Sequence, residues 1–465
     1  MKTLWITIFT YILSPLQGQI DQEKDALFIK SIHDQVLLDG ACYGWLDHLS
    51  EEIGGRLAGS AASEQAIYYT REQLSYISDT TYLQQCEVPY WVRGDEEKVI
   101  LIDPLTSDSL DIGGLALGNS IGTGDRGISG GIVEVSSLDE VRALGPNQLA
   151  GRIVFFNRPM DPTQIRTFYA YGGAVDQRVN GPSVASAQGA VAVLVRSITT
   201  SLDDYPHTGV TRYDPKHPEI PAIAISTQDA ELLHEMLLHQ SMDAHIVSSS
   251  RMVDEQKTSY NVIAEIKGST HPEEIILVGG HLDSWDVGGG AHDDGAGCVH
   301  SMQVLHTLHH LGYQPKRTIR CVLFMNEENG LGGGLAYARE SNEKGEWHMA
   351  AIESDAGGFT PRGFACDATD EVFAGFYRQV VQWEDILEPY YLSFTKGGSG
   401  ADINPLKSQN GLLFGFRPDS QRYFDFHHTS IDRIDVVNER ELKLGAAAMT
   451  SLVYLLDKYG LAQGE

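Results

Sequence analysis

The C-terminal half of the chain, from about Asn261 onward, alternates nearly continuous apolar segments with longer amphipathic ones. The apolar segments are 261–268, 273–281, 318–328, 347–357 and 411–417. Strands that are buried on both faces have this composition, because neither face contacts water. The segments between them carry a helical periodicity, as in 297–312, 372–383 and 439–460. We therefore predict an α/β fold in which a mostly parallel, mixed sheet has helices on both faces.

The first 250 residues divide into two parts with different patterns. Residues 25–77 have helical periodicity, and residues 80–94 follow with a strand-like pattern. From about residue 98 to 250, short apolar segments alternate with glycine-rich turns, and one long helical period falls at Gln228–His239. We therefore predict one α/β domain, residues 19–95 and 251–465, interrupted by a β-rich insert, residues 96–250.

Residues 1–18 have the pattern of a secretory signal peptide. Lys2 precedes the apolar sequence LWITIFTYIL, and small or polar residues follow up to Gly18. No other segment approaches the roughly 18 uninterrupted apolar residues that a membrane-spanning helix needs. We therefore expect a secreted or periplasmic protein without a stable membrane span.

The cysteine count and the net charge limit the redox chemistry and the partners. Five cysteines are too few for a disulfide scaffold in 465 residues, and a bridge between Cys42 and Cys86 stays open. With 34 basic and 63 acidic residues, the formal net charge is −29. Such a surface repels nucleic acid and anionic lipid. We expect no nucleic-acid partner, and the sequence leaves a homodimer open.

Histidines and carboxylates follow the predicted strands of the C-terminal half. Ligands of open α/β sheets bind at the carboxyl ends of the strands, so these residues would gather at one edge. They are His281, Asp283, Asp293, Asp294, Glu327, Glu328, Asp355, His427 and His428. Two imidazoles and three carboxylates suit two zinc ions that share a bridging carboxylate. Such a pair of ions can activate water as a nucleophile at neutral pH.

The adjacent glutamates predict a division of roles. One of Glu327 and Glu328 would ligate metal, and the other would act as general base toward the water, an effect worth about 10²–10⁴-fold in rate. Asp283, two residues after His281, is placed to accept the distal N–H of the imidazole and so fix the ring. Each motif alone is common in proteins that bind no metal. Their joint occurrence at consecutive strand ends favours a metal site.

The motifs carry a family resemblance. HLDSWDVGGGAHDDGAG, NEENGLGG, ESDAGG and HHTSID resemble the co-catalytic zinc exopeptidases of the aminopeptidase Y and glutamate carboxypeptidase superfamily. EEIGGRLAGS near the N-terminus, and GGSGADINPL with PDSQRYFDFHH near the end, resemble its carboxypeptidase Q branch. The insert resembles a protease-associated domain, which that branch carries at the same place. The resemblance covers nearly all of residues 19–465.

The resemblance implies a role for each residue of the site. Glu327 would be the general base, and Asp283 would orient a ligand. His428 is preferred to His427 because HTSID has the family's spacing of histidine, three residues and aspartate. The ligands of two Zn²⁺ ions, for which Co²⁺ or Mn²⁺ could substitute, would be His281, Asp293 as the bridge, Glu328, Asp355 and His428.

The resemblance also reaches the surroundings of the site. It implies a cis peptide bond between Asp293 and Asp294. His292 stands where the branch has a non-ligand residue, so we expect its side chain to point away, and Arg433 stands where the branch has threonine after Asp432. Substrate contacts would come from Ser399, Gly400 and Asp402. In the insert, Arg178 and Gly181-Pro182 would border the substrate entrance or serve the structure alone.

The implied activity is hydrolysis of dipeptides, or of terminal residues of small peptides, by a dinuclear zinc exopeptidase. Three alternatives remain. An aminopeptidase acting on longer chains would need the same metals. A single-zinc acyltransferase similar to glutaminyl cyclases is disfavoured because both His281 and Asp355 are present. A binding protein on an inactive peptidase scaffold is disfavoured because no ligand has been lost.

Overall fold

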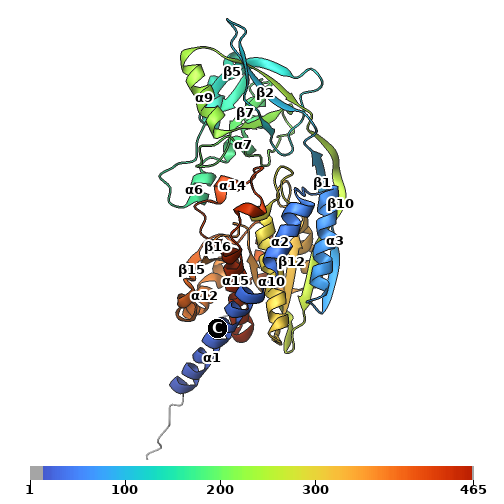
Figure 1. The fold of residues 1–465 in the computed structure, drawn as a ribbon, viewed down its shortest axis with the longest axis vertical. Helices are drawn as coiled ribbons and strands as arrows, with labels where there is room; N and C mark the ends of the chain where they lie inside the picture. The colour runs from blue at the N-terminus through green and yellow to red at the C-terminus, as the bar shows by residue number, and fades with distance from the viewer. Residues whose placement is uncertain (1–13, 463–465) are drawn as a thin grey trace, which may run out of the picture.

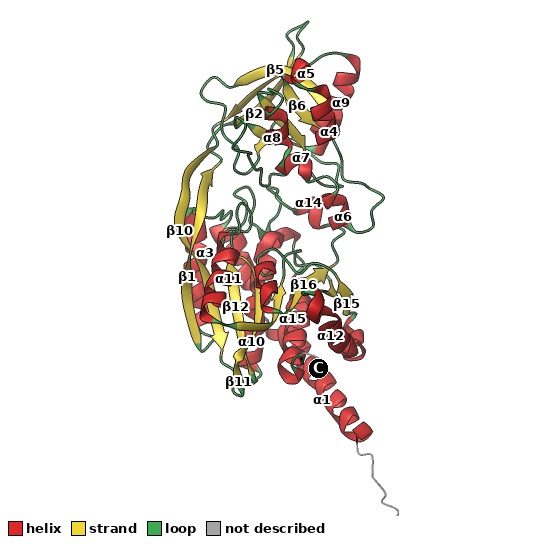
Figure 2. Cartoon of the chain, turned by 180° about the vertical axis from the view of Figure 1, so that it is seen from behind, coloured by secondary structure: helices red, strands yellow, loops and turns green. Residues whose placement is uncertain are grey.

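The computed structural model describes residues 14–462 and contains two eight-stranded sheets in that part of the chain. Figure 1 shows one sheet in the lower half of the molecule, among long helices, and the other in the upper half. The chain leaves the first sheet after β1 (Thr80–Val92) and returns in β10 (Arg251–Ile266), and these two strands pair antiparallel. Figure 2 shows them as a long ribbon that links the two halves. The predicted leader, residues 1–18, lies mostly outside the described residues.

The first sheet has a parallel centre. In spatial order its strands are β1, β10, β12 (Arg317–Phe324), β11 (His271–His281), β13 (Trp347–Glu353), β16 (Leu412–Pro418), β14 (Pro361–Asp367) and β15 (Ser393–Lys396). Strands β12, β11, β13 and β16 run parallel, whereas β10 pairs antiparallel with β12 and β14 antiparallel with β16. The predicted mixed, mostly parallel sheet is confirmed.

Helices cover both faces of this sheet. Successive side chains of a strand point to opposite faces, and in β11 Ile276 and Val278 belong to one apolar cluster while Leu277 belongs to another. The first cluster includes side chains of α10 and α15, and the second includes Tyr337 of α11, so these helices lie on opposite faces of the sheet. The helices of this half are α1 (Ser14–Asp39), α2 (Cys42–Asp47), α3 (Ala61–Ser75), α10 (Ala296–His310), α11 (Gly332–Lys344), α12 (Asp370–Val380), α13 (Glu384–Leu387), α14 (Tyr423–Phe426) and α15 (Glu439–Tyr459).

Local sequence signals set the ends of two of these helices. The Ser60 side chain accepts a hydrogen bond from the backbone N–H of Ser63 at the start of α3. The Asn438 side chain accepts from the N–H groups of Arg440 and Glu441 at the start of α15. Such caps satisfy N–H groups that have no partner within the helix.

The second sheet contains the segment predicted as an insert. Its strands, in spatial order, are β3 (Ser109–Asp111), β2 (Glu97–Ile102), β9 (Asp243–Ser248), β5 (Ile128–Val135), β6 (Ile153–Phe156), β7 (Ala192–Arg196), β8 (Ala222–Ile225) and β4 (Leu115–Ala116). Its helices are α4 (Leu138–Leu144), α5 (Pro146–Leu149), α6 (Thr167–Gly172), α7 (Asp176–Val179), α8 (Gly181–Ser186) and α9 (Thr227–His239). Only α9 has the length that gives a clear helical period. The domain boundaries and the protease-associated type stay predictions.

Two further expectations concern the whole chain. All five cysteines lie within the described residues, where they are buried and unpaired, so Cys42 and Cys86 form no bridge. Among residues 14–462, no helix combines the length and apolarity that crossing a bilayer requires.

Candidate metal centre

The strand ends of the parallel centre carry the predicted residues to one edge of the sheet. His281 is the last residue of β11, Glu327 follows the end of β12, and Asp355 follows the end of β13. Asp293 lies in the loop between β11 and α10, and His428 follows α14. Because the strands are parallel, their carboxyl ends lie next to one another, and segments distant in sequence meet there.

One group of side chains gathers around His281. Its Nε2 lies 3.4 Å from Oδ1 of Asp293 and 3.6 Å from Oδ1 of Asp355. One ligand atom of each residue lies within 4.8 Å of the others. His281 and Asp293 are buried, and the side chain of Asp355 is 26% exposed.

A second group gathers around His428. Its Nε2 lies 3.1 Å from Oδ2 of Asp293 and 3.2 Å from Oε2 of Glu328. Asp293 therefore directs one carboxylate oxygen toward each group and lies between them.

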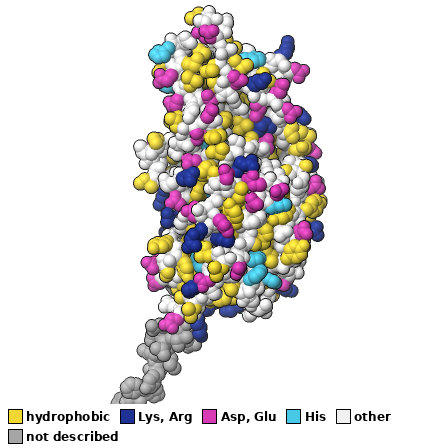
Figure 3. Space-filling model, viewed as in Figure 1, with side chains coloured by type: hydrophobic (Ala, Val, Ile, Leu, Met, Phe, Trp, Pro, Cys, Tyr) yellow, Lys and Arg dark blue, Asp and Glu magenta, His cyan; other side chains and the backbone are white. Residues whose placement is uncertain are grey.

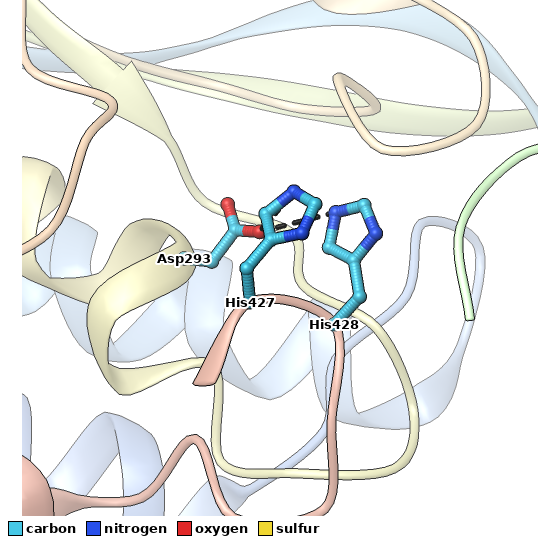
Figure 4. Close-up of side chains that lie close together, drawn as sticks. All are labelled: Asp293, His427 and His428. Carbon is cyan, nitrogen blue, oxygen red and sulfur yellow. Dashed lines mark ion pairs between the residues drawn. The ribbon is translucent and has the colours of Figure 1, made fainter. Parts of the chain in front are cut away.

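His427 also approaches this carboxylate. Figure 4 shows its ring beside that of His428, with both imidazoles next to Asp293. The two rings are stacked with centroids 3.4 Å apart, and Nε2 of His427 lies 3.7 Å from Oδ2 of Asp293. Of the two histidines, His428 is the one that also contacts Glu328.

The donor set fits zinc. Imidazole nitrogen and carboxylate oxygen are ligands that zinc uses in proteins. Oε1 of Glu328 is buried and has no hydrogen-bond partner within residues 14–462. Burial and the charge of Asp293 raise the pKa of Glu328 to about 7. A cation at this place would compensate buried negative charge that is otherwise costly.

Asp283 holds the turn that carries both glutamates. Its Oδ1 accepts hydrogen bonds from the backbone N–H groups of Asn326 (2.6 Å) and Glu327 (3.1 Å), and its Oδ2 accepts one from Glu328 (3.3 Å). Nδ1 of His281 lies 3.0 Å from the backbone oxygen of Asp283 and 3.9 Å from its carboxylate. The carboxylate of Asp283 was predicted to accept the ring N–H of His281, and this is wrong: the ring faces the backbone oxygen of Asp283 instead. The carboxylate accepts three backbone N–H groups of the turn.

The loop that carries Asp293 is held by neighbouring carboxylates. Asp432 accepts hydrogen bonds from the backbone N–H groups of His292 (2.7 Å) and Asp293 (3.0 Å). Asp294 accepts one from the backbone N–H of His281 at 3.1 Å. The Asp293–Asp294 peptide bond is cis, as the resemblance implied.

The two residues that depart from the family pattern lie outside both groups. Nδ1 of His292 accepts a hydrogen bond from the backbone N–H of Gly358 at 3.1 Å, and its ring stacks on Phe359. Its side chain therefore points away from the ligands, as expected. Arg433 forms an ion pair with Glu51.

Arg56, in the motif EEIGGRLAGS, is a supporting residue whose role the sequence pattern does not predict. The side chain is fully buried. Its guanidinium donates hydrogen bonds to the carbonyl oxygens of Leu282 (2.6 Å), Gly289 (2.7 Å) and Gly290 (3.0 Å). It therefore fixes the backbone on both sides of the loop that follows His281. The sequence does not predict this role, because the partners of Arg56 are backbone carbonyl groups more than 200 residues further along the chain.

A cavity of about 360 Å³ opens beside the two groups, and we call it the catalytic cavity. It is lined by Asp293, Asp355, Glu328 and His428 of these groups and by Glu327, whose pKa burial raises well above its ordinary value. The segment of the second sheet contributes Phe168, Tyr171 and Arg178. The volume lies in the range of small-molecule sites.

The predicted substrate segment contributes little to this cavity. Of residues 399–402, Ala401 alone is part of its lining, and the side chains of Ser399 and Asp402 are buried. Gly400 has φ +136°, and a Cβ atom there would lie 2.2 Å from Cδ of Glu353. Glycine is required at this position by close packing.

Comparison with known proteins identifies the family. Residues 261–453 match peptidase family M28. The carboxypeptidase Q of Xenopus laevis is 36% identical over an alignment of 478 positions, gaps included, that covers 98% of each chain. That of Bos taurus is 34% identical over 422 residues, 89% of this chain and 84% of the relative. The chain belongs to peptidase family M28, and it resembles carboxypeptidase Q over most of its length.

Solved structures agree with this fold. A peptidase M28 precursor from Shewanella amazonensis SB2B has a TM-score of 0.88 and 31% identity, and the match covers 96% of this chain and 98% of that one. BSAP, a zinc aminopeptidase from Bacillus subtilis, has a TM-score of 0.64 and 21% identity, covering 90% and 95%. The second likeness concerns the fold alone.

Proposed function

We propose that the protein is an exopeptidase that binds two zinc ions and hydrolyses dipeptides or terminal residues of small peptides. The observation that carries this proposal is the position of Asp293, 3.4 Å from Nε2 of His281 and 3.1 Å from Nε2 of His428 through different oxygens. In this proposal Asp355 completes the site of His281, and Glu328 completes that of His428. Zinc at these two sites supplies Lewis-acid polarisation of the scissile carbonyl and a nucleophile from water at neutral pH.

Glu327 is the proposed general base. It faces the catalytic cavity, and burial raises its pKa well above the ordinary value, which favours a carboxylate that takes up a proton and releases it again. It would accept a proton from the attacking water and transfer it to the leaving amine. Asp283, through its hydrogen bonds to the turn, would keep this carboxylate in position.

Arg178 supports recognition of a carboxylate end of the peptide. Its side chain is 4% exposed and lines the catalytic cavity, and its Nε has no hydrogen-bond partner among the described residues. Its other nitrogens donate to the Thr208 carbonyl (3.3 Å) and the Tyr171 hydroxyl (2.7 Å). No carboxylate of residues 14–462 pairs with it, and a buried guanidinium without a counter-ion is unfavourable. A substrate carboxylate would be the missing partner.

This arrangement favours a dipeptidase or carboxypeptidase over an aminopeptidase, which needs no anchor for a carboxylate. The relatives named carboxypeptidase Q point the same way. We further propose that the protein is exported to the periplasm or the cell exterior, because residues 1–18 have the pattern of a leader.

Substitution of Glu327 tests the chemistry. Glu327→Gln should lower kcat by about 10²–10⁴-fold, while metal analysis still finds two zinc ions per chain. Appreciable residual turnover would reject the role of Glu327, and one tightly bound zinc with pyroglutamate formation would favour a cyclase.

A substrate comparison tests the end specificity. The wild-type enzyme should hydrolyse Ala-Ala with a kcat/KM about 10- to 100-fold above that of its C-terminal amide, the value of one charged hydrogen bond. In Arg178→Met, the ratio of the two kcat/KM values should fall to about one. Arg196→Met is the matched control. Arg196 is a buried arginine of β7 that forms an ion pair with Glu231 (2.6 Å), and it does not line the catalytic cavity. Equal loss on both substrates would indicate a purely structural role for Arg178.

A further inference from the structure

The ring of His428 is oriented by a residue from the half of the molecule that contains the second sheet. Its Nδ1 donates a hydrogen bond of 3.2 Å to the backbone oxygen of Thr208, and the backbone N–H of Thr208 donates one of 3.1 Å to the carbonyl oxygen of His428. Thr208 lies between β7 and β8. A histidine that ligates metal through one nitrogen needs such an acceptor at the other, because it fixes the tautomer and the direction of the ring.

The other proposed histidine ligand is oriented from within its own half. Nδ1 of His281 lies 3.0 Å from the backbone oxygen of Asp283, two residues further along the chain. The two proposed metal sites therefore differ in what holds their imidazoles. The ring of His281 is fixed by the loop that follows it, whereas the ring of His428 is fixed by a segment that reaches it from the second sheet.

Arg93 holds Thr208 in place. The hydroxyl of Thr208 donates a hydrogen bond of 2.9 Å to the carbonyl oxygen of Ala116, and it accepts one of 3.4 Å from Nη2 of Arg93. Nη1 of Arg93 donates to the same carbonyl oxygen of Ala116. One guanidinium therefore contacts both Thr208 and the last residue of β4, and these three residues restrain one another.

The same guanidinium reaches the loop that follows His281. Its Nη2 donates a hydrogen bond of 2.7 Å to Oδ1 of Asp286, and its Nε donates one of 3.0 Å to Oδ2. Such paired hydrogen bonds fix the relative orientation of the two side chains. Arg93 is the first residue after β1, in the ribbon that links the two halves, and its side chain is 9% exposed. Arg93 therefore connects a loop of the first half with a segment of the second.

Apolar packing closes the same contact between the halves. On the face seen in Figure 3, the surface continues without a break from one half of the molecule to the other. Trp285, also in the loop after His281, belongs to an apolar cluster formed mainly by the second sheet, and its ring centroid lies 5.6 Å from that of His428. A Cβ atom at Gly118 would lie 1.8 Å from Cη2 of Trp285, so glycine leaves the space for this ring.

We propose that Arg93 is a positioning residue for the proposed zinc site of His428. It holds Thr208 in place, and the carbonyl of Thr208 directs Nε2 of the ring toward Asp293. The half that contains the second sheet thereby completes one of the two sites and leaves the ring of the other site independent of it. This inference rests on the proposed function and adds a residue to its metal centre.

Two variants test this role at different cost to the fold. Arg93→Met removes the guanidinium, whereas Thr208→Val removes only a hydroxyl and keeps the size of the side chain. The matched control for the second variant is Thr318→Val. The hydroxyl of Thr318 is also buried and donates to a backbone carbonyl, that of Pro272, at 2.8 Å.

Arg320→Met is the matched control for Arg93→Met. Arg320 is a buried arginine of β12 that forms ion pairs with two carboxylates, those of Glu265 (2.6 Å) and Glu346 (2.8 Å). Arg93 likewise pairs with two, because its Nη1 also lies 3.3 Å from Oε1 of Glu97. Both substitutions leave two carboxylates without their buried partner, so a general loss of stability should affect both variants.

The measurement is zinc binding to the metal-free protein, by calorimetry in competition with a chelator. The wild type and both controls should bind two ions per chain. Arg93→Met and Thr208→Val should lower the affinity for one ion by about 10- to 100-fold and leave the other unchanged. Thr208→Ser, which keeps the hydroxyl, should bind both ions as the wild type does. Added zinc should restore kcat in Arg93→Met, because Arg93 does not touch the reacting groups.

Variants of the two proposed histidine ligands identify the affected site. In a His428→Ala background, Arg93→Met should not change the affinity for the remaining ion, and in a His281→Ala background it should lower this affinity. If Arg93→Met does not fold, Thr208→Val decides in its place. Unchanged affinities for both ions, or an equal loss of both, would overturn the inference. A wild type that binds no zinc, or one ion only, would reject the proposed function and the inference with it.

Discussion

Asp432 accepts a hydrogen bond of 3.0 Å from the backbone N–H of Asp293, which lies 139 residues earlier in the chain. Its other carboxylate oxygen accepts one of 2.7 Å from the backbone N–H of His292. Asp432 follows His428 by four residues, so one carboxylate ties the segment of a proposed ligand to the loop of the proposed bridge. This contact gives a physical reason for the histidine–aspartate spacing in HTSID.

Asp432→Asn should weaken metal binding. The amide retains the shape but replaces one acceptor by a donor that faces a backbone N–H, so the loop of Asp293 would shift. We expect metal affinity to fall by about 10- to 100-fold, measured by competition with a chromogenic chelator. Asp435→Asn, at an exposed position nearby, should leave the affinity unchanged. Equal affinities for wild type and Asp432→Asn would contradict this account.

Asp283→Asn should affect the general base more than the metals. An asparagine has one acceptor oxygen for the three backbone N–H groups that the carboxylate now accepts. The turn of Glu327 should loosen, and kcat should fall by about 10- to 100-fold, as for other residues that support a metal site. Steady-state kinetics with metal analysis on the same sample would check this. Loss of metal in proportion to activity would indicate that Asp283 acts through the ligands instead.

The two adjacent histidines should differ. His428 contacts both Asp293 and Glu328, whereas the one carboxylate of residues 14–462 that His427 approaches is Asp293, at 3.7 Å. His428→Ala should therefore lose one of two metals and nearly all activity, because a proposed ligand is removed. His427→Ala should keep both metals, with activity lowered by less than about 100-fold. The number of metal ions bound per chain measures the difference. If His427→Ala lost one ion and His428→Ala lost none, His427 would be the ligand in place of His428.

Acid should destabilise the fold through buried neutral histidines such as His348. Burial lowers the pKa of His348 to about 4, and its ring contacts Tyr337 and Gln409. The unfolded chain takes up the proton near pH 6.5 and the folded chain near pH 4. Between these values the unfolded state binds more protons, so stability falls as the pH falls, by up to about 1.4 kcal/mol per pH unit.

Calorimetry measures this effect. The fall in Tm between about pH 7 and about pH 5 should be smaller in His348→Gln than in the wild type, because glutamine does not titrate in this range. An equal fall in both proteins would show that other groups carry the acid sensitivity.

Much of the fold was predictable because it depends on local composition. The apolar segments 273–281, 318–328 and 347–357 all contain strands of the first sheet, since only a doubly covered sheet buries such continuous stretches. In the second sheet, helices of four to seven residues such as α5 and α4 were not predicted. They are too short for a period of 3.6 residues to stand out, and packing holds them.

The candidate site likewise has a part that the sequence predicts and a part that it does not. His281, Asp293, Glu328, Asp355 and His428 were chosen from motifs and strand ends, and they do converge. The use of the Asp283 carboxylate and the burial of Ser399 and Asp402 were not predicted. Each depends on the direction in which one side chain leaves the backbone, and that direction is set by neighbours from other segments.

The sequence by itself determined which segments become buried strands and which metal-binding side chains follow them, because hydrophobic composition and spacing act over a few residues. Only the tertiary structure decided that Asp432 holds the loop of Asp293, that Arg56 closes the loop after His281, and that Arg178 reaches the catalytic cavity. These contacts join residues more than 100 positions apart. They form because buried charges and N–H groups must find partners wherever folding brings them together.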